Sequence, residues 1–320
     1  TPVLPVPYFN FPIDDRRTTG LLTPSFGFTN DGGLELAAPV YLNLAPNYDA
    51  TVTPRYIGNR GLMAEGEFRY LTENFGGGRI WGGYLPSDKD YNDEDRKDLH
   101  YLHNWKIDDQ WSTNLEYNYV SDKDFFTDLD NDPNTRTELN QRRAWQLNYG
   151  NGIPGLRAQL RVEDFQTIDP DLADIDRPYA RLPQLLVNYT KGDVQGLEFE
   201  FNNDTAYFKK NIRDFENQAE PNGTRIFNEM ALRYNLKQPW GFVVPEVSVR
   251  SLNNFYDQDT VENTNFRSNS EDKSVVVPQF TLDTGLTFER EGKYLQTLSP
   301  RAFYAYAPHQ NQDDYPNFDS

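Results

Sequence analysis

The chain has 320 residues, no cysteine, 14% aromatic residues and a formal net charge of −18, with a mean hydropathy of −0.79. Its abundant Tyr and Phe argue against a disordered chain, and its acidic balance disfavours a nucleic-acid partner, whose phosphates attract Lys and Arg. No run reaches the ~18 apolar residues of a membrane-spanning helix, an exclusion that does not extend to a transmembrane β-barrel, whose strands turn only alternate residues to lipid.

The first twelve residues are rich in proline, at Pro2, Pro5, Pro7 and Pro12. Because proline donates no backbone N–H, this stretch does not fit a central strand and indicates an edge strand or a linker that leads into a sheet. The chain also begins without a basic, apolar signal segment. We therefore expect it to start at a mature or internal position.

Two further prolines, Pro24 and Pro39, fall inside the first two predicted strands, which are joined near the Asn30–Gly33 turn. A proline removes one ladder hydrogen bond, so it belongs at an edge or at a bulge. One interpretation is that both residues simply mark bends. The other is that the first strand lies at a seam that pairs weakly.

Strict alternation of apolar and polar residues is the dominant pattern in the rest of the chain. It is clearest at 115–119, 156–163, 197–202, 230–237 and 280–289. Since successive side chains of a strand point to opposite faces, each of these segments has one apolar and one polar face. No comparably clear helical period occurs, so the pattern predicts an all-β, antiparallel fold.

The connections between the predicted strands alternate in length. Short turn signals lie near 74–78, 108–110, 150–155, 191–196, 237–241 and 291–293. Longer polar stretches lie at 87–98, 121–138, 169–178, 209–224, 257–273 and 308–320. A membrane barrel inserted from the periplasm has tight turns on one side and long loops on the other, which this alternation matches. The acidic residues of the loops, such as Asp88 and Asp90, are interpreted as solvated surface.

Counting from Arg16 gives about 15 strands, many with roughly the 9–11 residues that a tilted membrane strand needs. Bacterial single-chain barrels have an even number of strands, and an open edge in lipid would leave costly unpaired backbone groups. We therefore expect further strands outside this sequence.

An acidic stretch resembles the start of a calcium-binding loop but departs from it at the decisive positions. The matching residues are Asp128, Asp130, Asp132 and Asn134. Pro133 replaces the glycine of the sharp turn, and Leu139 stands where a bidentate Glu is required. A solvated acidic loop is the better interpretation.

No other pattern predicts a catalytic, cofactor or metal site. His100 and His103 are three residues apart, which places them on opposite faces of a strand, where they cannot share a metal. No spacing selects a carboxylate pair for glycoside hydrolysis, and no phosphate loop or nucleophile elbow occurs. We expect a protein that is not an enzyme and has no cofactor.

Several long runs resemble, in the same order, the barrel of the lipopolysaccharide-assembly family LptD. The runs are FPIDDRRTTGLLTP (11–24), NLAPNYDATVTPRY (43–56), EFRYL (67–71), YLPSD (84–88) and LQTLSPRA (295–302). They contain the motif residues by which we identify the start of the barrel: Arg16, Arg17, Gly20, Asn43, Pro46, Asn47, Asp49 and Arg55.

The resemblance implies that 1–15 ends a periplasmic β-jellyroll and its linker, and that 16–320 is the N-terminal part of an outer-membrane β-barrel. This part would be about the first half of a 26-stranded antiparallel transmembrane barrel. The family inserts lipopolysaccharide into the outer leaflet through a lateral gate at its first strand, and Pro24 and Pro39 match the gate prolines.

The resemblance also implies the partners and the location. The expected partners are lipopolysaccharide, an LptE-like plug lipoprotein in the lumen, an LptA-like periplasmic bridge that joins through the jellyroll, and outer-membrane lipids. The expected location is the outer membrane of a Gram-negative bacterium. Two alternatives stay open from the residues themselves. One is a porin or TonB-type solute transporter barrel, and the other is a soluble all-β carbohydrate-binding or hydrolytic protein.

Overall fold

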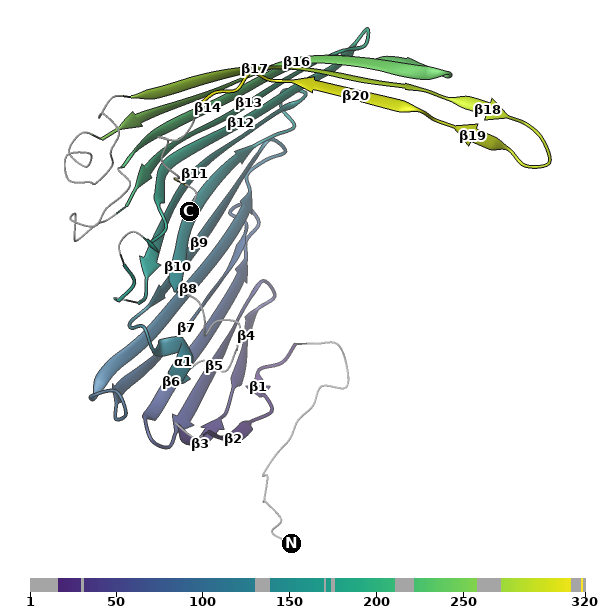
Figure 1. Cartoon of the computed structure of the whole chain (residues 1–320). Coiled ribbons are helices and arrows are strands. Elements are labelled where there is room, and N and C mark those ends of the chain that lie inside the picture. The colour runs from purple at the N-terminus through teal and green to yellow at the C-terminus, as the bar shows by residue number, and fades with distance from the viewer. Residues whose placement is uncertain are drawn as a thin grey trace. The chain divides into compact units, whose positions relative to one another are not determined.

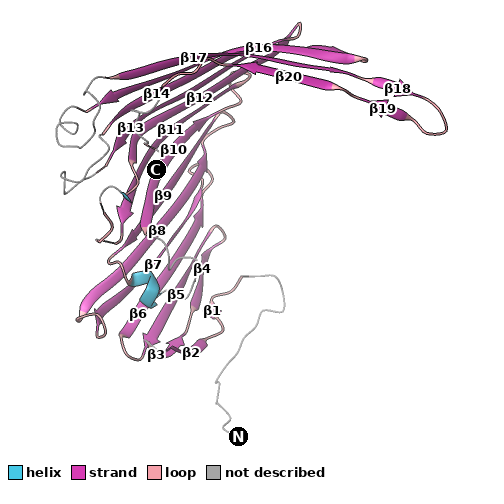
Figure 2. Cartoon of the chain, viewed as in Figure 1, coloured by secondary structure: helices cyan, strands magenta, loops and turns pink. Residues whose placement is uncertain are grey.

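The computed structural model describes residues 17–29, 32–129, 139–169, 171–173, 176–210, 222–257, 272–311 and Phe318. Arg16 and the predicted segment 1–15 lie outside this part of the chain. The described residues are mostly antiparallel strand with one short α-helix, α1 (Phe125–Leu129), as Figures 1 and 2 show. Eighteen strand segments belong to one sheet and two to a small ribbon, so the predicted all-β fold is confirmed and is consistent with part of a barrel.

The chain divides into two compact units. The first is built mainly from β1 (Gly20–Leu21), β2 (Ser25–Thr29), β3 (Gly33–Ala37), β4 (Val40–Ala45), β5 (Tyr48–Ile57), β6 (Gly61–Leu71), β7 (Gly77–Asp88), β8 (Glu94–Lys106) and β9 (Trp111–Val120). The second contains β12 (Ala180–Val194), β13 (Leu197–Lys209), β14 (Gly223–Tyr234), β15 (Leu236–Gln238), β16 (Gly241–Tyr256), β17 (Lys273–Leu286), β18 (Phe288–Arg290), β19 (Gln296–Leu298) and β20 (Arg301–Tyr306). The strands β10 (Asn140–Tyr149) and β11 (Leu156–Thr167) contribute residues to both.

The described strands form twenty segments, more than the predicted number, because several strands are interrupted. Five pairs of consecutive segments continue one run across a break of one to three residues: β1–β2, β3–β4, β14–β15, β17–β18 and β19–β20. Joining each pair reduces the twenty segments to fifteen runs. Each of the runs from β5 to β8 pairs antiparallel with the next run along the chain, so a simple meander results.

In the second unit, one row of side chains across five neighbouring strands is apolar and exposed. The row is Phe199, Leu232, Val247, Phe280 and Tyr306, which pair in that order across β13, β14, β16, β17 and β20. Their exposed fractions run from 37% to 59%. In the adjacent row, Arg233 donates to Glu198 at 2.7 Å and to Glu246 at 2.6 Å. The sheet therefore has an apolar face and a polar face, as the alternation predicts.

Buried apolar side chains gather at two places instead of forming one layer beneath a sheet. In the first unit, α1 contributes three side chains to a cluster with strand residues, namely Ile57, Met63, Leu85, Val120, Phe125, Phe126, Leu129 and Ile168. In the second unit, the cluster is Tyr179, Ala206, Phe208, Tyr256 and Phe318. Within the described ranges, no helix has the length and apolar character needed to cross a lipid bilayer.

Two of the predicted long loops differ in the structure. The strands β7 and β8 extend into the stretch 87–98, which leaves only 89–93 as the connection. The stretch 121–138 contains α1, which the sequence pattern did not predict, because a helix of five residues is too short to show a helical period. Residues 130–138, with most of the acidic stretch interpreted as a solvated loop, lie outside the described part.

Candidate functional site

The first two strand runs are both interrupted beside a proline, and the two interruptions lie opposite each other. The ladder between β2 and β3 runs from Thr29↔Gly33 to Ser25↔Ala37, and the ladder between β1 and β4 resumes at Leu21↔Val40. Residues 22–24 therefore face residues 38–39, a three-against-two mismatch that contains Pro24 and Pro39. We call β1, β2, β3 and β4 together the N-terminal seam.

The mismatch is bridged by few backbone hydrogen bonds. Leu22 N donates to Pro39 O at 2.8 Å, and Ala38 N donates to Pro54 O of β5 at 3.1 Å. Neither Pro24 nor Pro39 has an N–H, so neither residue can donate a backbone bond across the interruption. Both prolines lie directly before the strand segment that follows the break, at Ser25 and at Val40.

The first run lies at the edge of the sheet and carries large exposed rings. Figure 1 draws β1 and β2 at the end of the series of strands that begins the first unit. Phe26 and Phe28 of β2 are 85% and 77% exposed. The second run is held more extensively, because β3 and β4 both pair with β5 on their other side. The seam is therefore weak on the side of the first run.

Family-motif residues meet around the buried carboxylate of Asp49 in β5. Arg69 donates to Asp49 from Nε at 2.8 Å and from Nη2 at 2.9 Å. The Tyr41 hydroxyl donates at 3.0 Å and Arg17 Nη1 at 3.4 Å. A carboxylate with four charged or hydroxyl donors joins three runs of the sheet at one end of the seam.

The motif asparagines hold the same end through the backbone. The backbone N–H of Asn43 donates to Thr19 Oγ1 at 2.9 Å, and its side-chain amide donates to Arg17 O at 2.8 Å. The side-chain amide of Asn47 donates to Leu71 O at 2.8 Å. These bonds attach β4 to the residues before β1, and the turn after β4 to the end of β6. They involve side chains and are not part of a strand ladder.

The other motif residues occupy separate places. Gly20 lies in β1 opposite Tyr41, and Pro46 lies in the turn between β4 and β5. Arg55 lies near the opposite end of β5 from Asp49, so the structure does not bring it together with the first group. Arg16 lies outside the described residues. The motif thus comprises two sites, one at each end of the seam.

Arg55 is a buried cation with three acceptors on three elements. Its Nη2 donates to Glu35 of β3 at 2.9 Å, and its Nη1 donates to Glu65 of β6 at 3.1 Å. The same Nη1 donates at 2.7 Å to the backbone carbonyl of Leu129, the last residue of α1. A guanidinium suits this position because its planar fork presents several donors in fixed directions.

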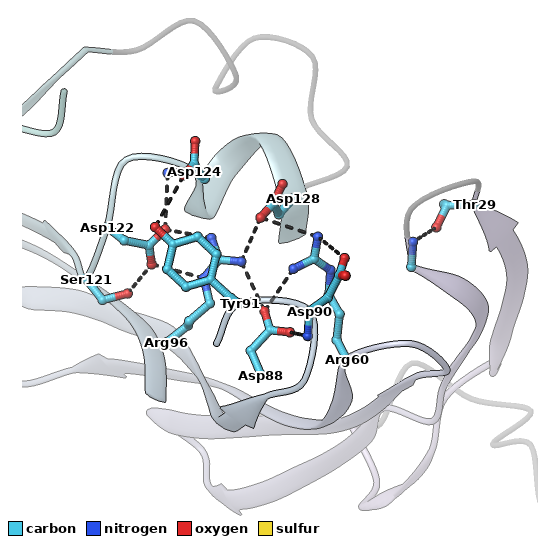
Figure 3. Close-up of polar contacts among 11 residues, drawn as sticks. Thr29, Arg60, Asp88, Asp90, Tyr91, Arg96, Ser121, Asp122, Asp124 and Asp128 are labelled. Atoms are coloured by element: carbon cyan, nitrogen blue, oxygen red, sulfur yellow. Dashed lines mark hydrogen bonds and ion pairs between the residues drawn. The ribbon is translucent and has the colours of Figure 1, made fainter. Parts of the chain in front are cut away.

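A buried ion-pair network lies beneath α1, and Figure 3 shows its members. Arg96 of β8 donates to Asp122 at 2.6 Å, to Asp128 at 2.8 Å and to Asp88 at 3.1 Å. Arg60, in the turn between β5 and β6, donates to Asp88 at 2.9 Å. We call α1 and the five residues Arg60, Asp88, Arg96, Asp122 and Asp128 the clasp. The prediction that this acidic stretch is simply solvated is therefore wrong for Asp88, which is fully buried.

Tyr91 closes the clasp from the connection between β7 and β8. Its ring centroid lies 4.1 Å from the guanidinium carbon of Arg96, a cation–π contact, and its hydroxyl donates to Asp124 at 3.3 Å. Burial raises the pKa of Tyr91, and the negative charges of Asp122 and Asp124 act in the same direction. The tyrosine is therefore held in its neutral form well into the alkaline range.

The two histidines take separate structural roles, on opposite faces as predicted. His100 Nδ1 bonds the side-chain oxygen of Asn118 at 2.8 Å, and its ring stacks on Trp81. His103 Nδ1 bonds the Tyr70 hydroxyl at 2.7 Å. Among the described residues, no group of His, Asp and Glu is arranged to hold a metal ion.

Comparison with known proteins assigns the chain to a family. The family described as LptD, LPS transport system D, matches residues 94–320. A protein of Acinetobacter baumannii called LPS-assembly protein LptD is 69% identical over 319 residues, which cover 100% of this chain and 39% of that protein. Proteins of the same name from Acinetobacter baylyi and Psychrobacter cryohalolentis are 67% and 40% identical, over 100% of this chain and 39% and 34% of their own lengths. The chain therefore spans about two fifths of the curated relatives' length, and it belongs to the LptD family.

Proposed function

We propose that this chain is the first part of an outer-membrane barrel that delivers lipopolysaccharide to the outer leaflet, and that the N-terminal seam is its lateral gate. The observation that carries the proposal is the pair of opposed interruptions at Pro24 and Pro39. The names of the relatives, LPS-assembly proteins, supply the cargo.

The two faces of the sheet suit the two parts of a lipopolysaccharide molecule. Rows of exposed apolar side chains, such as Leu232 and Val247, match hydrocarbon. The opposite face carries paired charges, such as Arg233 with Glu198, and suits sugars and water. A molecule with a lipid part and a sugar part can therefore leave through the side of the barrel only if the lipid passes between two strands.

The prolines give that passage a physical basis. A ladder hydrogen bond contributes about 0.5–1.5 kcal/mol net in water and more in lipid, where no solvent replaces it. Two positions without an N–H therefore lower the cost of separating the first run by roughly 1–3 kcal/mol. The Asp49 cluster holds the other end of the seam, so the first run would bend at the interruption while staying attached.

The wider assembly is part of the proposal. The first run would pair with a strand that lies outside this sequence. A barrel of that size has a wide lumen, which an LptE-like plug lipoprotein would fill. Lipopolysaccharide would arrive over an LptA-like periplasmic bridge, and outer-membrane lipids would surround the apolar face.

The test is the double variant Pro24→Ala and Pro39→Ala in the full-length protein, expressed as the sole copy. Restored N–H groups strengthen the seam, so delivery of lipopolysaccharide to the surface falls by roughly tenfold. The matched control is Pro245→Ala in β16, a proline inside an unbroken ladder with β17. Unchanged delivery in the double variant overturns the gate. Solute conduction by the purified protein without any dependence on lipopolysaccharide favours a porin instead.

A further inference from the structure

The clasp connects α1 to several strands of one block of the sheet. Asp128 of α1 is bonded by Arg96 at 2.8 Å and lies 3.3 Å from Arg60, so the helix is tied to β8 and to the turn between β5 and β6. The apolar side of α1 packs on Ile57, Met63 and Leu85, which belong to β5, β6 and β7. We call β5, β6, β7 and β8 the braced block.

The seam is built in the opposite way. Its interruptions remove ladder bonds, and β3 is joined to β5 by three register pairs, from Glu35↔Ile57 to Ala37↔Arg55. Backbone bonds extend this ladder on both sides, from Gly58 N to Leu34 O at 2.8 Å and from Ala38 N to Pro54 O at 3.1 Å. A side-chain attachment between β3 and the braced block would add to this backbone ladder when the first run moves.

Arg55 supplies that attachment. It is 8% exposed, and it bonds Glu35 on the seam, Glu65 on the braced block and the Leu129 carbonyl of α1. The last carbonyls of a helix have no partner within the helix, so a cation there satisfies one of them. One guanidinium thus connects the second run of the seam to both the block and its brace.

We propose that Arg55 is a positioning residue that fastens β3 to the braced block, so that opening of the seam is confined to the first run. The role of Arg55 in transport rests on the proposed function. The structural claim, that β3 separates from the braced block when Arg55 loses its bond to Glu35, can be tested without it. When the bond to Glu35 is removed, β3 leaves with β1 and β2, and the opening becomes wider than one strand.

The two glutamates give a matched pair of variants. Glu35→Gln and Glu65→Gln each remove one charged acceptor from the same guanidinium, the first on the seam and the second within the block. Glu65 is the more exposed of the two side chains, at 34% against 15%. Because this difference in burial could make the two variants unequally stable, the stability of both is measured. The measurement is the temperature at which the folded band disappears on electrophoresis.

The measurement is the distance distribution between two spin labels in the purified full-length complex in detergent. Labels replace Leu36 of β3 and Leu62 of β6, two exposed residues that lie in one row, since Leu36 pairs with Tyr56 and Tyr56 pairs with Leu62. A second pair, Leu62 and Leu99, reports on the braced block alone. Noncanonical residues carry the labels, so the labelling does not depend on cysteine.

Glu35→Gln is expected to raise the population of long Leu36–Leu62 distances by roughly five- to tenfold, since a hydrogen bond to a charged group is lost. Glu65→Gln leaves that population unchanged, and neither variant alters the Leu62–Leu99 distances. In cells, Glu35→Gln alone admits large antibiotics such as vancomycin. Equal distributions in the two glutamate variants overturn the inference. The two proposals can also be separated. If only Glu35→Gln changes the distances, but the double proline variant delivers lipopolysaccharide normally, the role of Arg55 stands and the gate is rejected.

Discussion

The clasp makes a sharp prediction at Asp88, the carboxylate shared by two buried arginines. Its Oδ2 accepts from Arg60 at 2.9 Å and from Arg96 at 3.1 Å, and its Oδ1 accepts from the backbone N–H of Asp90 at 3.0 Å. Asp88→Asn keeps the size of the side chain and removes the charge. Two guanidinium groups, each almost fully buried, then lose their common counter-ion.

The expected cost follows from what stays and what is lost. Breaking a buried pair by removing one partner costs about 3–5 kcal/mol. Asp122 and Asp128 still face Arg96, and the half-exposed Asp90 still faces Arg60, so part of this cost is offset. The amide oxygen of Asn also accepts one bond. We expect a loss of roughly 2–4 kcal/mol in the stability of the folded barrel.

The assay is unfolding of the purified full-length protein in detergent by guanidinium chloride, followed by tryptophan fluorescence. Asp93→Asn is the matched control, because Asp93 lies in the same acidic connection, is exposed, and has a positive φ of 57°, which Asn tolerates. The midpoint for Asp88→Asn should fall well below both wild type and Asp93→Asn. If the two variants have the same midpoint, the clasp does not brace the sheet.

The remaining predictions concern α1 and Tyr91. Leu129→Ala truncates a side chain that is 2% exposed, so we expect the free energy of unfolding to fall by about 2–5 kcal/mol. Protease cleavage next to α1 should become faster. Cleavage no faster than in wild type would contradict the packing. Because the pKa of Tyr91 is raised in the folded state, its contribution is complete below the ordinary tyrosine pKa and is lost as the pH rises through the raised value. Tyr91→Phe should therefore weaken the decline of the guanidinium midpoint above about pH 10, and an identical alkaline decline in both proteins would reject the assignment.

The sequence by itself determined the features that depend on neighbours along the chain. Side chains alternate between two faces with period two, so the apolar and polar faces of a strand such as β14 can be read from its own sequence. A proline lacks an N–H wherever the chain places it, so the sequence alone marks Pro24 and Pro39 as positions that donate no ladder bond. The long family runs were likewise visible in the residues alone, and so was the membership that the comparisons confirm.

Only the tertiary structure decided which charges are buried. Asp88 and Asp90 look alike in the sequence, but only Asp88 points at two arginines and is excluded from solvent. The bond from Arg55 to the Leu129 carbonyl joins residues 74 positions apart, and no local sequence pattern predicts a contact over that separation. Electrostatic partners are chosen by proximity in space, after the strands are paired and α1 is packed, so the clasp and the fastening of β3 become visible only in the folded chain.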